Sequence, residues 1–292
     1  MPPAPTPLSR LVKLVTEAAA LIDVGHPAHA AIQEAAVLGQ GFDNYVEAHS
    51  GELYVPDTFS EEQVRQVWTD LLKATDEQNW RALWEQGKTQ FALTSGMCSG
   101  NYEATVLQQI GLMLRPKNVL EIGVFTGTAT LAVALLPSVE KVIGLDIEPF
   151  LEEFDRPYWR RAGVSDKIQT MIGPATDSLM TLKTNKHAKF DLIFIDADKP
   201  SYQTYVSSIL EHDLLAIDGV ILADNTLLKG FPWAAENASL LPSEARRYEG
   251  TFNKSVEIAC QGIDDFNKFC IQKDLFSTML PIRDGVTVIR RR

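Results

Sequence analysis

The sequence has few cysteines, no excess of positive charge and no long apolar run, and each absence excludes a class of protein. Three cysteines occur among 292 residues, Cys98, Cys260 and Cys270, and they form neither a CxxC pair nor zinc-finger spacing, which indicates a reducing compartment. The formal net charge of −11 disfavours nucleic acid and anionic membranes as partners. No stretch approaches the roughly 20 apolar residues of a membrane span, and the proline-rich start does not resemble a signal peptide. We therefore expect a cytoplasmic protein that binds a small molecule, not nucleic acid or membrane.

The first 95 residues show helical spacing only. Apolar residues recur three and four apart in the segments Leu8–Leu21, Ala28–Ala48, Ser60–Ala74 and Glu77–Gly87. We expect residues 1–95 to form an all-helical extension that either pairs subunits in a homodimer or covers the ligand site.

From Asn101 onward, short apolar runs alternate with helical stretches of roughly ten to twenty residues, as crossover connections require. The runs are apolar at consecutive positions, as in strands covered on both faces. They are Asn118–Gly123, Lys141–Ile147, Ile168–Gly173, Asp191–Ala197 and Gly219–Asn225. Near the end, Asp284-Gly285 separates two more strand-like runs, which is typical of a hairpin. Residues 96–292 are expected to form an α/β domain with a Rossmann-like, doubly wound, seven-stranded sheet ending in an antiparallel hairpin.

Residues after the first strands indicate a cofactor site, because ligands bind beyond the carboxyl ends of such strands. Gly123 and Gly127 form GxxxG, not the GxGxxG that receives a pyrophosphate, and Glu121 precedes them. Tight helix packing would explain the glycine pair equally well. Asp146 follows the second strand, where such folds hold ribose hydroxyls, although a helix N-cap is its alternative role. A loop without phosphate-binding glycines and with acidic neighbours favours S-adenosylmethionine as the cofactor.

Carboxylates and one amide follow the next two strands. Asp196 and Asp198 come after the fourth strand, and Asp224 and Asn225 after the fifth. Because adjacent parallel strands end at one edge, Asp196, Asp224 and Asn225 can converge as oxygen ligands for Mg²⁺, Mn²⁺ or Ca²⁺. Separate capping and turn roles are the alternative. Beside a metal and a sulfonium, the pKa of Lys199 would fall towards that of a general base; alternatively it is a loop lysine paired with Asp198.

Four motifs in this order resemble the cation-dependent, S-adenosylmethionine-dependent O-methyltransferases of the caffeoyl-CoA and catechol type. The motifs are VLEIGVFTGTATLAVA, DLIFIDADKPSYQTY, GVILADNTLLKG and LPIRDGVTVIRR, and the resemblance covers residues 99–292. It implies metal ligation by Asp196, Asp224 and Asn225, with Asp196 and Lys199 as catalytic residues. The cofactor contacts that it implies are Ser99, Glu121, Gly123, Val124, Gly127, Thr128, Asp146, Ala175, Asp196 and Asp198. Thr128 or Thr130 would replace a serine that the family has where this chain has Ala129.

The resemblance also assigns an acceptor side. Tyr205 would face the substrate, and Lys229 stands where plant members have an asparagine that often meets it, so we expect an acceptor other than a CoA thioester. The helical start and the LPIRDG ending are more similar to O-methyltransferases of mycosporine and gadusol biosynthesis, whose acceptor is an enolised cyclohexenone. Residues 231–250 read as an insertion that either covers the acceptor pocket or forms a surface loop.

The sequence thus predicts methyl transfer from S-adenosylmethionine to one oxygen of a small vicinal diol, phenolic or enolic, chelated by a divalent cation. One rival keeps the fold but transfers to oxygen or nitrogen without a metal. A second is a nucleotide-binding oxidoreductase, which the missing GxGxxG disfavours. A third is a non-catalytic interaction protein, which the intact set of Asp196, Lys199, Asp224 and Asn225 disfavours.

Overall fold

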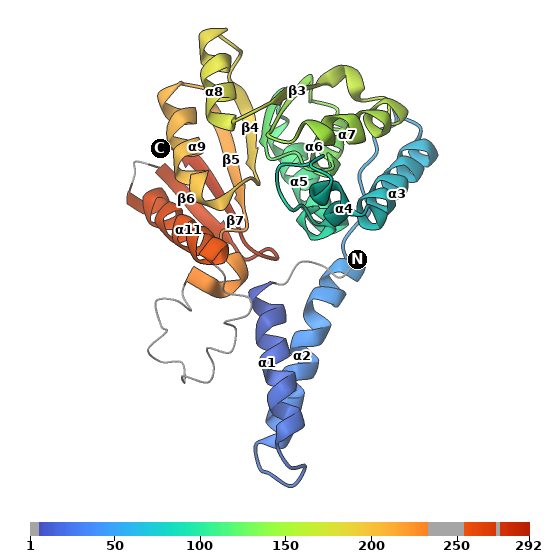
Figure 1. Cartoon of the computed structure of the whole chain (residues 1–292), viewed down its shortest axis with the longest axis vertical. Coiled ribbons are helices and arrows are strands. Elements are labelled where there is room, and N and C mark those ends of the chain that lie inside the picture. The colour runs from blue at the N-terminus through green and yellow to red at the C-terminus, as the bar shows by residue number, and fades with distance from the viewer. Residues whose placement is uncertain (1–5, 233–253, 273–274) are drawn as a thin grey trace.

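The computed structural model describes residues 6–232, 254–272 and 275–292, so most of the expected insertion at 231–250 lies outside the described residues. An α/β body carries a projecting two-helix hairpin (Figure 1). The helices are α1 (Pro7–Leu21), α2 (His29–Ala48), α3 (Glu61–Glu77), α4 (Trp80–Glu85), α5 (Gly100–Leu114), α6 (Thr128–Ala134), α7 (Pro149–Arg161), α8 (Ala175–Thr184), α9 (Tyr202–Glu211) and α11 (Lys254–Gln272). The strands are β1 (Asn118–Ile122), β2 (Lys141–Asp146), β3 (Ile168–Ile172), β4 (Phe190–Ile195), β5 (Leu215–Asp224), β6 (Leu275–Leu280) and β7 (Val286–Arg291).

The seven strands form one sheet in the order β3-β2-β1-β4-β5-β7-β6. The first five are parallel, and β7 pairs antiparallel with both β5 and β6. The chain reverses its direction of strand addition between β1 and β4, which is where a doubly wound sheet opens its ligand crevice. The expected fold, including the terminal hairpin, is confirmed.

Helices cover both faces of the sheet, which explains why the strands are apolar at consecutive positions. One core cluster joins strand side chains to α3, α5, α6 and α7, and includes Trp68 and Trp159. The other joins the opposite strand face to α8, α9 and α11, and includes Tyr202 and Phe266. The two layers are visible on either side of the sheet in Figure 1.

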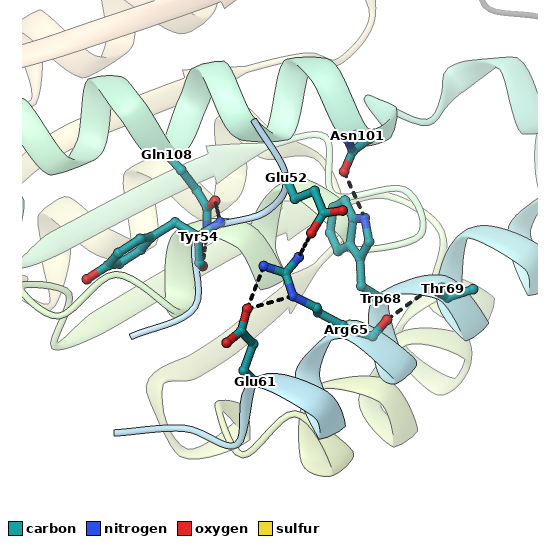
Figure 2. A network of polar contacts seen from close by, with 8 residues as sticks. All are labelled: Glu52, Tyr54, Glu61, Arg65, Trp68, Thr69, Asn101 and Gln108. Atoms are coloured by element: carbon teal, nitrogen blue, oxygen red, sulfur yellow. Dashed lines mark hydrogen bonds and ion pairs between the residues drawn. The ribbon is translucent and has the colours of Figure 1, made fainter. Parts of the chain in front are cut away.

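Polar contacts hold Tyr54 and α3, which precede α5 in the chain, against α5 (Figure 2). Gln108 of α5 accepts a hydrogen bond from the backbone N–H of Tyr54 at 2.7 Å and donates to its carbonyl at 3.0 Å. Trp68 of α3 donates to the Asn101 side chain at 3.2 Å. Leu53 and α3 also belong to the core cluster under the sheet, so packing is continuous across the expected boundary at residue 95.

Among the helices that the structure describes, only α1 and α2 extend away from the body, as an antiparallel pair (Figure 1). Thr6 caps α1 by accepting a hydrogen bond from the Ser9 amide at 3.1 Å. In the part of the chain that the structure describes, no helix is long and apolar enough to cross a membrane.

Candidate active site

A large cleft opens at the carboxyl ends of the parallel strands and has a volume of about 1710 Å³. It is lined by β1, β2 and β4 ends, by the start of α5 and by the turn after β5. Eleven of the residues expected from the sequence line it: Ser99, Gly123, Asp146, Ala175, Asp196, Asp198, Lys199, Tyr205, Asp224, Asn225 and Lys229. Glu121, Val124, Gly127 and Thr128 are not among its lining residues.

The β1 loop is shaped by a glycine and an aspartate. Gly123 has a φ of +92°, and a Cβ on it would lie 2.3 Å from the backbone oxygen of Asp196, so only glycine fits this approach of β1 to β4. The Asp146 carboxylate accepts hydrogen bonds from the amides of Val124 at 2.9 Å and Phe125 at 3.0 Å. Asp146 therefore holds the loop in place, and its other oxygen accepts from the amide of Glu148 at 2.9 Å.

Glu121 lies behind the cleft rather than in its wall. It is 3% exposed and accepts a hydrogen bond from the Thr130 hydroxyl, while its Oε1 has no hydrogen-bond partner among the described residues. Burial raises its pKa to about 8, and the negative charges of Asp196 and Asp146 act in the same direction. The Thr130 hydroxyl, one of the two expected to replace a cofactor-binding serine, therefore donates its hydrogen bond to Glu121.

Gly127 and Thr128 start α6 below the β1 loop. Gly127 has a φ of +65°, and its carbonyl accepts a hydrogen bond from the Trp159 indole at 3.2 Å. Thr128 is buried, with its hydroxyl 3.5 Å from the Cys98 sulfur. Tight packing, the alternative role for the glycine pair, applies to Gly127, because a Cβ on it would lie 2.5 Å from the Trp159 ring.

The three expected metal ligands come together at the ends of neighbouring strands. Ile195 pairs with Ala223 in the register of β4 and β5, so Asp196 and Asp224 leave the sheet side by side. Asp224 is 3% exposed, and burial followed by repulsion from Asp196 raises its pKa to about 7. Asn225 adopts a left-handed conformation with φ +56°, which asparagine tolerates well. Within the described residues, no three or more His, Cys, Asp or Glu side chains are arranged to hold a metal ion, so a site here would consist of two carboxylates and an amide.

Lys199 points into the same cluster. Its ammonium donates to Asp196 Oδ1 at 2.8 Å and to the Tyr202 hydroxyl at 2.9 Å. Burial alone would lower the pKa of Lys199, but the Asp196 carboxylate and Tyr202 outweigh burial and raise it. The lowering expected from the sequence depends on a bound metal and sulfonium and stays a prediction, whereas the carboxylate that pairs with Lys199 is Asp196 and not the alternative partner Asp198.

Asp198 instead binds hydroxyl groups of the following helix. It accepts hydrogen bonds from the side chains of Ser201 and Tyr205. Tyr205 is 6% exposed, and burial together with Asp198 raises its pKa. Tyr205, the residue expected to face the substrate, therefore lines the cleft while its hydroxyl donates a hydrogen bond to Asp198.

The β6–β7 turn reaches the cleft, which the sequence reading did not anticipate. Arg283 forms an ion pair with Glu103 of α5, with Nε 3.2 Å from Oε1, and both line the cleft. Asp284 accepts a hydrogen bond from the amide of Lys229, and its own carbonyl accepts from the amide of Leu227 at 2.8 Å. These bonds fix a turn in which Lys229 has a φ of +57°. The only sequence signal was the Asp284-Gly285 hairpin, which says nothing of where the turn points.

Acidic groups dominate the inner end of the cleft. Burial and the nearby Asp224 raise the pKa of Glu103 well above its usual range, and Arg283 opposes them. Burial also raises the pKa of Asp284 to about 6. Such an arrangement can bind cationic ligands and can orient a hydroxyl group beside the Lys199 ammonium.

The model of the O-methyltransferase family matches residues 74–292, which is most of the chain. Caffeoyl-CoA O-methyltransferase 1 of Eucalyptus globulus is 36% identical over 191 residues, covering 65% of this chain and 72% of that protein. Caffeoyl-CoA O-methyltransferase of Medicago sativa is 35% identical over 192 residues, with the same coverage of 65% and 72%. The crystal structure of a Podospora anserina methyltransferase bound to SAH superposes with a TM-score of 0.65 at 25% identity, covering 87% of this chain and 95% of that one. The chain belongs to the O-methyltransferase family.

Proposed function

We propose that this protein transfers a methyl group from S-adenosylmethionine to one hydroxyl of a small vicinal diol, either a catechol-like phenol or an enolised cyclohexenone, with the help of a divalent cation. The observation that carries the proposal is the convergence of Asp196, Asp224 and Asn225 at two neighbouring strand ends, in the cleft that Gly123 and Asp146 also line. The SAH-bound relative from Podospora anserina supports the choice of cofactor.

The proposed ligand set fits a hard cation such as Mg²⁺, because all three donors are oxygens. The raised pKa of Asp224 also fits, since Asp196 repels its charge and a cation between them would relieve that repulsion. Asp196, Asp224 and Asn225 would hold the cation, and the cation would lower the pKa of a chelated hydroxyl and fix its orientation.

The chain's own residues orient the reactants. Asp146 fixes the β1 loop against which the cofactor would lie. Lys199, whose ammonium lies 2.8 Å from Asp196 Oδ1, is proposed to act beside the acceptor oxygen, as an orienting cation or as the base that assists its deprotonation. The buried acidic groups stabilise a bound sulfonium, whereas the positive charge partly disperses during transfer, so much of the acceleration must come from alignment.

The acceptor side of the proposal rests on Tyr205 and Lys229, which line the cleft near Asp198 and Asp284. Both are proposed to contact the acceptor, and the cofactor contacts that line the cleft are proposed to be Ser99, Gly123, Asp146, Ala175 and Asp198. The substrate is a small molecule, and the protein is proposed to work as a homodimer.

The test is a labelled-methyl assay with S-adenosylmethionine over catechols and cyclohexenone enols, after treatment with EDTA and with or without added Mg²⁺. We expect turnover that requires the cation in the wild type and is reduced by about two orders of magnitude or more in Asp224→Asn. SAH binding, measured by calorimetry, should remain within about threefold. A full rate after EDTA would leave the metal-independent rival in place, and absence of methyl transfer to every diol would refute the acceptor class.

A further inference from the structure

A small cavity lies beside the main cleft, between α5 and the sheet. It has a volume of about 20 Å³, which is room for one water molecule. Nine of its twelve lining residues are apolar. The other three are Ser99, Glu103 and Asp224, and the same three also line the cleft. The polar side of the cavity therefore adjoins the cleft at one of the proposed cation ligands.

Two of these polar residues reach the cavity from one face of α5. Ser99 is the N-cap residue of α5, and in the described structure its side chain makes no capping hydrogen bond. Glu103 follows four residues later, which is the spacing of neighbours on a helix surface. The helix therefore brings a hydroxyl and a carboxyl group to the same end of the cavity.

Glu103 is held in this position by Arg283. The Arg283 Nε lies 3.2 Å from Glu103 Oε1, and the two side chains are 11% and 18% exposed, so the pair is largely shielded from solvent. Salt screens such a pair less than it screens a pair on the surface. Because Arg283 belongs to the turn between β6 and β7, the ion pair joins this turn to α5 at the cavity.

Asp224 faces the same cavity from the end of β5. Its Oδ1 accepts a hydrogen bond from the Asn225 amide at 2.7 Å, and Oδ2 has no hydrogen-bond partner among the described residues. After burial, Asp224 has the largest effect in raising the pKa of Glu103, ahead of Asp196, so the two carboxyl groups are close. Buried polar atoms need a partner, and a water molecule with two to four polar neighbours meets that need.

We propose that Glu103, held by Arg283, is a positioning residue for the cation site: through one water molecule in this cavity it holds Asp224 in the orientation in which Asp224 binds the cation. The inference rests on the proposed function, because it needs a cation at Asp196 and Asp224. Hydrogen bonds from surrounding groups orient the ligands of a metal ion, and loss of such a group typically weakens metal affinity by about 10- to 100-fold.

The test measures Mn²⁺ binding to the full chain by electron paramagnetic resonance, with SAH present and without an acceptor. Glu103→Ala removes the carboxyl group and should weaken Mn²⁺ affinity by about 10- to 100-fold. Glu103→Gln keeps an oxygen for Arg283 and for the water, so its affinity should stay within about threefold of the wild type. The affinity for SAH, measured by calorimetry, should stay within the same range in both variants.

Arg283→Met tests whether Arg283 acts through Glu103. It should weaken Mn²⁺ affinity at least about threefold in the wild-type background and have no further effect when combined with Glu103→Ala. A purely electrostatic role predicts the reverse, since removal of a positive charge favours a nearby cation. The matched control is Glu152→Ala, which breaks another partly buried ion pair, with Arg156, whose two members are not among the residues that line the cleft. The control should keep the Mn²⁺ affinity of the wild type.

A crystal structure of the protein should show one ordered water within about 3.2 Å of both Glu103 and Asp224, and an empty cavity would overturn the proposal. Equal Mn²⁺ affinity in Glu103→Ala and the wild type would also overturn it, as would equal losses in Glu103→Gln and Glu103→Ala or tighter binding by Arg283→Met. In each of these cases the wild type still binds Mn²⁺ and the proposed function stands. A wild type that binds neither Mn²⁺ nor Mg²⁺ would refute the cation of the proposed function and this inference with it.

Discussion

Replacing Gly123 by alanine should destabilise the protein because the new methyl group meets the backbone of another strand. A Cβ at this position would lie 2.3 Å from the oxygen and 2.7 Å from the carbonyl carbon of Asp196. The residue also has a φ of +92°, which alanine rarely adopts. Two separate costs therefore combine, one from backbone strain and one from overlap.

The magnitude follows from these two costs. A residue with a side chain at positive φ loses about 1–2 kcal/mol, and forced overpacking in a rigid region costs about 1–3 kcal/mol. Backbone cannot rotate away as a side chain can, so the overlap is relieved only if β1 and β4 move apart. The sum of roughly 2–5 kcal/mol corresponds to a fall of about 5–15 °C in Tm for a chain of this size.

Thermal unfolding with two matched controls separates the costs. Gly87→Ala tests strain alone, because Gly87 has a φ of +69° and a Cβ there would meet nothing within 4 Å. Gly51→Ala tests the loss of glycine alone, since its Cβ would also meet nothing and its φ is not in the left-handed range. We expect Tm to fall little for Gly51→Ala, more for Gly87→Ala and most for Gly123→Ala. If Gly123→Ala melts within about 2 °C of Gly87→Ala, the close approach of the β1 loop to Asp196 is wrong.

Two further changes test the buried polar groups. The folded pKa of Glu121 is about 8, above its ordinary 4.5, so the native state keeps a proton that the unfolded chain releases, and stability should fall as pH rises from about 5 to about 8. Glu121→Gln should flatten this profile in urea unfolding, with an upper bound of roughly 4–5 kcal/mol, and parallel profiles for both proteins would contradict the assignment. Gln108→Leu leaves both backbone groups of Tyr54 without their partner and should cost about 2–4 kcal/mol, whereas Gln109→Leu, at an exposed position on the same helix, should cost little.

The sheet could be predicted from the sequence because strands covered on both faces leave an unbroken apolar signature. The expected runs match β1 to β4 closely, β5 begins at Leu215 and so four residues before the expected run, and Asp284-Gly285 does join β6 to β7. The grouping of Asp196 with Asp224 and Asn225 was also accessible, because parallel neighbours end at one edge and the chain order of the strands is readable.

The direction in which individual side chains point could be predicted from the sequence much less well. Glu121 faces Thr130 behind the cleft because it alternates with Leu120 and Ile122, which turn to the other side of β1. The pKa direction of Lys199 depends on a contact with Asp196 that spacing along the chain does not define. Arg283 reaches Glu103 across 180 positions of sequence, and no local pattern predicts such a contact.

The turn between β6 and β7 completes the cleft with residues that lie far along the chain from the loop at Gly123. The segment from Thr226 to Lys229 is held by hydrogen bonds to Asp284 and Gly285, which follow the parallel strands in the chain. The parallel strands and the loop at Gly123 precede this turn in the chain and can pair before it exists. A chain truncated ahead of Asp284 is therefore expected to keep the loop at Gly123 but to lose the hydrogen bonds that set the backbone of Lys229.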